Sequence, residues 1–282
     1  MGSRLRVDEL RPGMRLHLYP HRGSADDLVG PLAASAERQA EIGGATTTLV
    51  RAEPATREAS EAALAGWLQA DGFVGQYATG TNTSLTIEFQ TVTEEEHDWV
   101  QRHLQVVFPE VHQHVRTFET ADATLSGRRI RLYGEVLRPF VESWGLLARR
   151  HDLRVPTKLW NAPNIAVAAY LRSIFQADGY VTVEGGSGRV AFAVISERWT
   201  EDIQVLLLRL GIFSRRLRKA ERRPDRSDLF EVQISVHSER AAFQSKVGFL
   251  SAAKAATLDA SLELDGKTCL SLREEEILAV ED

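Results

Sequence analysis

The stretch that decides the fold is Leu64-Ala65-Gly66-Trp67-Leu68-Gln69-Ala70-Asp71-Gly72, because the chain contains it twice. The second, looser copy is Leu171-Arg172-Ser173-Ile174-Phe175-Gln176-Ala177-Asp178-Gly179, 107 residues further along. Both copies end in Gln-Ala-Asp-Gly followed by an aromatic residue, and both predict a helix that stops at glycine. An internal duplication of this kind predicts two structurally similar halves.

The similarity continues beyond the two motif copies. Each copy is followed by a glycine-containing hairpin with an alternating strand, at 85–89 and 189–194. A helix follows, opened by the capping box from Thr93 in the first half and by Ser196 in the second. Two further strands are expected at 111–119 and 128–133, and at 213–218 and 230–236, before matching final helices near 140–147 and 243–250. Each half is therefore expected to be helix, two strands, helix, two strands, helix, which is an α+β fold.

The duplication also sets the expected domain boundaries. Residues 56–161 form the first half with its linker, and residues 162–260 form the second half. Pro156 and Pro163 interrupt helical structure and suit a short linker between the halves. Residues 1–55 and 261–282 are flanks outside the duplication, and a short helix is expected at 26–39.

Composition indicates a globular protein. The chain has 282 residues, of which 43% are hydrophobic and 26% charged, enough to form one large core or two smaller ones. Its start lacks a secretory signal, no apolar run approaches the roughly 18 residues of a membrane helix, and Cys269 is alone. We therefore expect a cytoplasmic protein with no membrane partner. The net charge of −5 argues on average against nucleic acid, although 29 of the 34 basic residues are arginine, the better bidentate ligand for phosphate and guanine.

The motif itself carries the chemistry. Small residues let the two motif helices pack closely, and a pseudo-two-fold axis between them would place Asp71 and Asp178 side by side. An acid in the last turn opposes the helix dipole by about 0.3–1 kcal/mol. Taken singly, Asp-Gly is a helix stop, with Gly72 and Gly179 as left-handed caps. Occurring twice in equivalent positions, it predicts a site for a hard divalent cation suited to phosphodiester hydrolysis. The candidate metal ligands are Asp71, Asp178, Ala70 and Ala177, and the expected ion is Mg²⁺, with Mn²⁺ or Ca²⁺ able to occupy the same site.

At these residues the chain resembles the LAGLIDADG homing endonucleases, and the resemblance covers residues 57–260. It implies two pseudosymmetric αββαββα halves packed through the motif helices, with antiparallel sheets forming a saddle in the DNA major groove. It also implies a monomeric, nucleoid-associated hydrolase in which Asp71 and Asp178 bind divalent metal at the cleavage centre. The implied activity is cleavage of double-stranded DNA at a long asymmetric target with staggered 3′ overhangs, which promotes intein or intron mobility.

The chain departs from the family pattern at two kinds of position. Gln69 and Gln176 replace the earlier acid of the motif, a change that concerns the fine tuning of the site rather than activity. Lys254 matches the family's basic residue in the second half, either stabilising phosphate charge or standing as a plain surface lysine. Leu153 occupies the corresponding position in the first half, which leaves the two half-sites unequal. Arg150, Arg154 or Lys158 could substitute there.

Basic residues on the predicted strands are the candidate DNA contacts, with a solvated basic face as the alternative interpretation. His112 and His114 lack a third ligand for zinc and are expected at the surface or facing DNA. The acidic run 94–96 is expected to be a solvated helix start. The DNA-binding candidates are Arg116, Arg128, Arg129, Arg131, Arg189, Arg215, Arg216, Arg218, Lys219, Arg222 and Arg223.

The flanks add a further signal. Residues 7–16 and 274–280 resemble segments of an intein splicing domain on either side of an endonuclease insertion. Three functions therefore stay open at this point. The first is an active homing endonuclease, the second a non-cleaving DNA-binding regulator or RNA-splicing maturase on the same scaffold, and the third an insertion whose homing activity has decayed.

Overall fold

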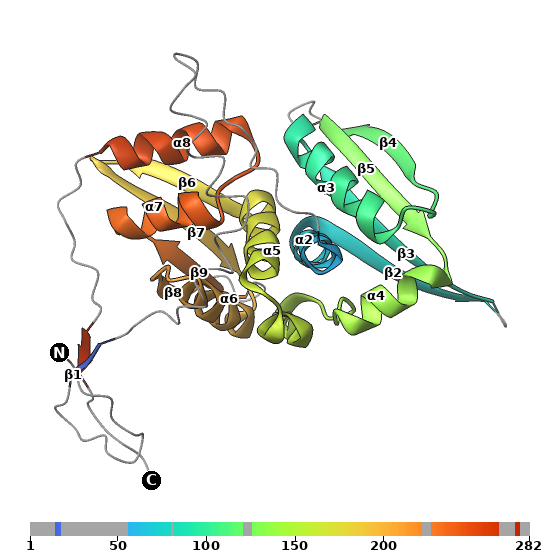
Figure 1. Cartoon of the computed structure of the whole chain (residues 1–282), viewed down its shortest axis with the longest axis horizontal. Helices are drawn as coiled ribbons and strands as arrows, with labels where there is room; N and C mark the ends of the chain where they lie inside the picture. Colours follow the sequence, from blue (N-terminus) through green and yellow to red (C-terminus); the bar gives the residue numbers. More distant parts are fainter. Residues whose placement is uncertain are drawn as a thin grey trace, which may run out of the picture.

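A computed structural model describes residues 15–17, 56–79, 82–120, 126–221, 227–264 and 274–276. The duplicated part consists of two halves that lie side by side (Figure 1). The first half contains α2 (Arg57–Asp71), β2 (Gly72–Thr79), β3 (Asn82–Thr91), α3 (Glu94–Val107), β4 (His114–Glu119), β5 (Ser126–Tyr133) and α4 (Arg138–Ser143). The second contains α5 (Asn164–Ala177), β6 (Gly179–Glu184), β7 (Ser187–Val194), α6 (Glu197–Arg209), β8 (Arg215–Lys219), β9 (Leu229–Ile234), α7 (His237–Lys246) and α8 (Ala252–Glu263). Short 3-10 turns η3 (Glu135–Leu137), η4 (Arg150–Asp152) and η5 (Thr157–Asn161) complete the first half and the connection.

The two sheets have the same topology. The strand order is β2-β3-β5-β4 in the first and β6-β7-β9-β8 in the second, and all neighbouring strands are antiparallel. The predicted α+β fold of two pseudosymmetric halves is therefore confirmed. The structure adds α8 as a separate helix after the last expected one, and it shortens the matching final helix of the first half to six residues.

The helix starts follow from their capping residues. The Thr56 hydroxyl accepts a hydrogen bond from the backbone of Ala59 at the start of α2. Thr93 and Glu96 form the complete capping box predicted for α3, and Ser196 caps α6. These short side chains satisfy backbone N–H groups that the first helical turn leaves without partners.

Helices α2 and α5 pack against each other at the centre of the molecule (Figure 1). A Cβ on Gly66 would lie 2.6 Å from the carbonyl oxygen of Tyr170, so only glycine permits this approach. The interpretation of Gly72 and Gly179 as left-handed caps is wrong. Gly72 has an extended backbone with φ −125°, and Gly179 does not have the positive φ of a left-handed residue. Both lie against the preceding helix turn, where a Cβ would come within 2.4 Å of Leu68 Cα and 2.5 Å of Phe175 O respectively.

Hydrogen bonds fix the register of the two motif helices within this largely apolar interface. The Tyr170 hydroxyl donates to Oε1 of Gln69 at 2.5 Å and accepts from the indole of Trp199 at 3.1 Å. The indole of Trp99 in α3 donates to Ser173 in α5 at 3.0 Å. All five residues are buried, and two of the three hydrogen bonds join a side chain of the first half to a side chain of the second. Satisfied buried hydrogen bonds of this kind favour one packing arrangement over its alternatives.

The two flanks meet each other. Strand β1 (Arg15–His17) pairs antiparallel with β10 (Glu274–Glu276), although more than 250 residues separate them. The helix expected at 26–39 lies outside the described residues. Within the described part of the chain, no helix has both the length and the apolar character required to cross a bilayer.

Candidate metal and DNA-binding site

The two motif aspartates lie at the ends of the paired central helices. Asp71 is the last residue of α2, and Asp178 is the residue that caps α5. Burial and the negative charge of Glu96 raise the pKa of Asp71 to about 6, against a smaller opposing effect of Arg129. Burial and the negative charge of Asp71 raise the pKa of Asp178 to about 7, although this side chain keeps contact with solvent. The two carboxylates therefore repel each other across the interface.

This pair of carboxylates fits a divalent cation. A cation between two crowded carboxylates would remove their repulsion, and carboxylate oxygens are the ligands that Mg²⁺ and Ca²⁺ prefer. Among the described residues, no group of three or more His, Cys, Asp or Glu side chains forms a complete metal cage. Such a cation would need further oxygen ligands beyond these two side chains. Backbone ligation at Ala70 and Ala177, which are half-exposed at the two helix ends, stays a prediction.

Lys254 lies at the second-half aspartate, in the first turn of α8. Its Nζ donates hydrogen bonds to the carbonyl oxygens of Gln176 and, at 2.7 Å, Gly179. These two residues bracket Asp178, so the ammonium group lies at the negative end of the α5 dipole. Burial lowers the pKa of Lys254, and the charges of Glu96 and Asp178 oppose that effect.

The first half has no equivalent lysine among the described residues around Asp71. Arg154 forms a two-point ion pair with Asp202 at 2.6 and 2.9 Å. Lys158 lies 2.6 Å from the carboxylate of Glu61. Glu61 precedes Asp71 by ten residues on α2, which corresponds to about 15 Å along the helix axis. Neither Arg154 nor Lys158 is therefore brought to the aspartates, and the cation that lowers the pKa of Asp71 is Arg129. Arg150 is exposed in η4, and its role as a substitute stays a prediction.

Glu96 is an unexpected member of this centre. The acidic run 94–96 is typical of a solvated helix start, but Glu96 is 7% exposed. Its Oε2 accepts from the backbone of Val92 and Thr93, and its Oε1 accepts from Gln176 Nε2 at 2.7 Å. The capping-box spacing predicts the local bonds of Glu96, whereas its contact with the other half depends on tertiary packing.

Strand register determines which basic residues share a face with the aspartates. In an antiparallel sheet, directly opposed residues project to the same side, and side chains alternate along each strand. Asp71 immediately precedes β2, whose pairing with β3 begins at Gly72 and Phe89. Gln90, the next residue of β3, pairs with Arg129, which in turn pairs with Arg116, and the charge of Arg129 lowers the pKa of Asp71. The neighbouring row on that face contains Glu88, Arg131 and His114. A shallow groove here is lined by Glu88, His114, Arg116, Thr117, Phe118, Arg129, Arg131 and Tyr133.

The second sheet presents Arg189, Arg215 and Lys219 on the face of Asp178. Arg216 and Arg218 project to the opposite face, where they pair with Glu201 and Asp228. A five-residue strand with a side-chain period of two cannot turn all four basic residues of 215–219 toward one partner. Arg128 likewise faces the other side of its sheet and pairs with Glu94 at 2.6 Å. Arg222 and Arg223 lie outside the described residues.

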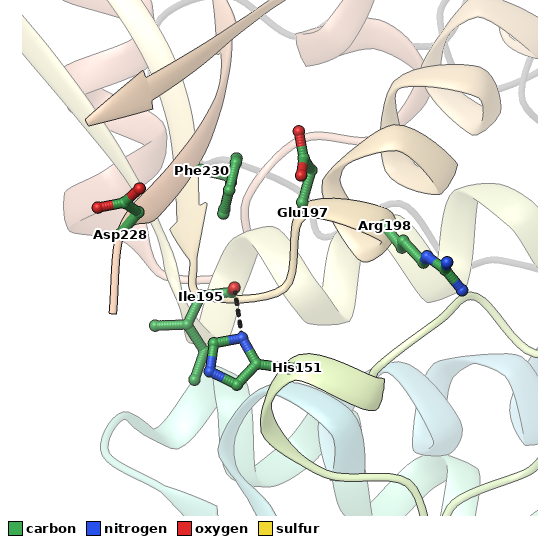
Figure 2. Close-up of a pocket in the computed structure, with 6 residues that line it drawn as sticks. All are labelled: His151, Ile195, Glu197, Arg198, Asp228 and Phe230. Atoms are coloured by element: carbon green, nitrogen blue, oxygen red, sulfur yellow. Dashed lines mark hydrogen bonds between the residues drawn. The ribbon is translucent and has the colours of Figure 1, made fainter. Parts of the chain in front are cut away.

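A separate pocket lies where the linker meets the second half (Figure 2). His151 Nδ1 is 3.2 Å from the carbonyl oxygen of Ile195, and Nε2 is 3.1 Å from the Ser227 hydroxyl. Figure 2 shows Ile195 beside the imidazole, with Phe230 and Glu197 farther away on the other side of the pocket. The pocket contains neither motif aspartate, and its hydrogen bonds dock the linker against the second half.

Residues 166–248 match the sequence profile of the LAGLIDADG-like domain. The replicative DNA helicase DnaB of Synechocystis sp. is 32% identical over 114 residues, which cover 39% of this chain and 13% of the helicase. A DNA gyrase subunit of Mycobacterium leprae is 26% identical over 194 residues, which cover 67% of this chain and 14% of the gyrase chain. This chain therefore spans only about one seventh of the length of these two relatives.

Solved structures agree on the fold. A variant of I-DmoI in complex with its target DNA in the presence of Mn is 12% identical, with a TM-score of 0.51 and coverage of 68% of this chain and 94% of that chain. The architecture is thus that of the LAGLIDADG homing endonucleases, with two pseudosymmetric halves joined through their motif helices. Residues 166–248, which contain the second copy of the motif, thus match the family that the repeated motif predicts.

Proposed function

We propose that this chain is a monomeric homing endonuclease that cleaves double-stranded DNA at a long asymmetric site and leaves staggered 3′ overhangs. The observation that carries this proposal is the pair of motif aspartates at the shared helix ends, with pKa values of about 6 and 7. Two crowded carboxylates on the same faces as Arg129 and Arg215 suit a metal ion next to a bound phosphate backbone. Packing of both motif copies within one chain supports the monomer.

In this proposal Asp71 and Asp178 would hold the divalent ion, with Mg²⁺ as the expected species. When bound, the ion would activate a water molecule and stabilise negative charge on the leaving oxygen. Lys254 holds the backbone on both sides of Asp178 and adds positive charge beside the phosphate. Arg129 supplies the cation on the Asp71 side. The arginines of the two exposed faces would bind phosphates and base edges.

We also propose that the endonuclease belongs to an intein. The curated relatives include a helicase, an initiation factor and a gyrase subunit, whose functions differ and which match this chain over a small share of their own length. A segment that recurs within unrelated proteins favours a mobile insertion over a shared host function. Pairing of β1 with β10 brings the two flanks together, as insertion into a host chain requires.

The experiment is cleavage of a plasmid that carries the uninterrupted allele of the gene in which the coding region lies. With Mg²⁺, we expect the wild-type chain to linearise the plasmid, and Asp71→Asn and Asp178→Asn each to lose at least about 10²-fold in rate. Asp98→Asn is the matched control, because it removes the same charge from an exposed position of α3. Undiminished double-strand cleavage by either motif variant would overturn the assignment of roles.

The alternative is a DNA-binding regulator or maturase without cleavage. A non-cleaving regulator predicts specific binding of the same duplex, measured by electrophoretic mobility, with no strand cut in Mg²⁺ or Mn²⁺, whereas a maturase predicts specific binding of RNA. Binding without cleavage by the folded wild-type chain would therefore favour the alternative and refute the endonuclease proposal.

A further inference from the structure

Each exposed sheet face carries an acidic side chain among its basic residues. The Glu88 side chain is 14% exposed in the first sheet, and Glu231 is completely buried in the second. A carboxylate repels the phosphates of DNA, so its presence on a face proposed to bind DNA needs a reason.

Glu88 holds Arg131 in one orientation. Arg131 Nε donates to Glu88 Oε2 at 2.5 Å, Nη2 contacts the same oxygen, and Nη1 donates to the Tyr133 hydroxyl at 3.3 Å. Arg129 Nε lies farther away, 3.9 Å from Glu88 Oε1. A guanidinium group has five N–H donors in a rigid plane, so at least two remain to bind a ligand after these contacts. Arg131 is thereby preorganised, with part of its donor edge available on the exposed face.

Glu231 holds Lys219 in a comparable way. The carboxylate of Glu231 accepts hydrogen bonds from Lys219 Nζ, Gln233 Nε2 and the Tyr180 hydroxyl, the last at 2.9 Å. Although burial raises the pKa of Glu231, these hydrogen bonds bring it below its usual value. Glu88 lies on the second strand of its half and Glu231 on the fourth, so the duplication does not account for both.

Stability alone explains the Glu88 pair poorly. The Arg131 side chain is 41% exposed, and partly exposed ion pairs typically contribute between nothing and about 1 kcal/mol. The acid also lowers the attraction of the face for phosphate. Fixing the rotamer of a long flexible side chain, in contrast, lowers the entropy cost of forming hydrogen bonds to a ligand.

We propose that Glu88 is a positioning residue for sequence recognition, which holds Arg131 so that its remaining N–H donors bind the O6 and N7 acceptors of a guanine in the major groove. Glu231 plays the same part for Lys219 in the other arm of the target. Arginine and lysine are the side chains that pair with these guanine acceptors. The inference rests on the proposed function, because it requires the exposed sheet faces to bind duplex DNA.

The test is selection of bound duplexes from a library randomised over the target length, followed by sequencing. We expect wild-type protein to enrich an asymmetric site, and Glu88→Gln to lose about tenfold of its guanine preference at one position of one arm. Preferences in the other arm should stay unchanged. Affinity for a duplex of unrelated sequence should rise by about twofold or more, since the substitution removes a repulsive charge.

Two matched variants complete the experiment. Glu119→Gln removes an equal charge from the same sheet, but Glu119 is exposed on the face opposite Glu88 and should leave both readouts at wild-type values. Arg131→Met should lose the same guanine preference as Glu88→Gln while lowering non-specific affinity. A purely structural role of Glu88 would instead lower affinity for all sequences together with the melting temperature.

Failure of the inference is distinguishable from failure of the proposed function. If wild-type protein enriches a site and Glu88→Gln enriches the same site with equal preferences, Glu88 has no positioning role. If folded wild-type protein enriches no sequence, the DNA-binding proposal itself is wrong.

Discussion

Gln176 of the second half donates a hydrogen bond from Nε2 to Oε1 of Glu96 in the first half, at 2.7 Å. The amide oxygen of Gln176 accepts from the backbone of Leu250 at 2.9 Å and of Ser251 at 3.2 Å. These residues immediately precede α8, which carries Lys254. One buried amide thus ties a helix start of the first half, the second motif helix and the start of α8 together beside Asp178.

We expect Gln176→Met to lower the free energy of unfolding by about 2–4 kcal/mol. The substitution keeps similar volume but leaves a buried carboxylate oxygen and two backbone N–H groups without partners. Urea denaturation measures the change. Gln105→Met, at an exposed position of α3, should stay within about 0.5 kcal/mol, and an equally small effect at Gln176 would contradict the prediction.

The pKa of Asp178 predicts a pH dependence of stability. Its value of about 7 in the folded chain exceeds the usual 3.8, so the folded state binds this proton more tightly than the unfolded state. The contribution to stability is therefore complete below about pH 4 and is lost as the pH rises to about 7. In metal-free buffer at pH 8, the free energy of unfolding of Asp178→Asn should exceed that of wild type by about 1–2 kcal/mol, after discounting for solvent screening. Near pH 3.5 the two free energies of unfolding should be equal.

Wild type and Asp178→Asn also allow metal binding to be measured in the absence of DNA. Millimolar Mg²⁺ or Ca²⁺ at pH 8 should raise the melting temperature of wild type, because binding to the folded state stabilises it by mass action. The increase should disappear in Asp178→Asn. An equal increase in both proteins would place the ion elsewhere.

Lys254→Met should slow cleavage of one DNA strand about 10²-fold and cause nicked plasmid to accumulate before linear product. The reason is that Lys254 lies beside Asp178 alone, whereas Arg129 serves the Asp71 side. Gel analysis of a supercoiled substrate separates the two products. Lys158→Met should cleave both strands at the wild-type rate, because Lys158 pairs with Glu61 away from the aspartates. Equal loss in the two variants would argue against this assignment.

The two faces of β8 make different predictions for the salt dependence of DNA affinity. Arg215 shares the face of Asp178, so Arg215→Ala should weaken binding across sequences and reduce the slope of log affinity against log salt by about one. Arg216 projects to the other side and pairs with Glu201, so Arg216→Ala should leave the slope unchanged. Titrations at several salt concentrations measure both slopes. A flat salt response of the wild-type chain would remove this face from the DNA footprint.

Much of the fold could be predicted because its signals are local. The duplicated motif, the alternating strands and the capping box at Thr93 each specify a short segment, and the structure contains all of them. The substitute cations of the first half could not be assigned this way. Arg154 and Lys158 are near the linker in sequence, but their partners Asp202 and Glu61 lie 48 and 97 residues away along the chain.

The sequence by itself determined the duplication, the order of elements and the two aspartates at the ends of the motif helices, because helix and strand periodicity and glycine stops are encoded within a few residues. Only the tertiary structure decided which side chains meet at those aspartates. The contact of Glu96 with Gln176, the position of Lys254 at the end of α5 and the choice of which face of the sheet Arg215 occupies all depend on how distant elements pack and on strand register. Those relationships arise from the burial of apolar surface between the two halves, which no short stretch of sequence specifies alone.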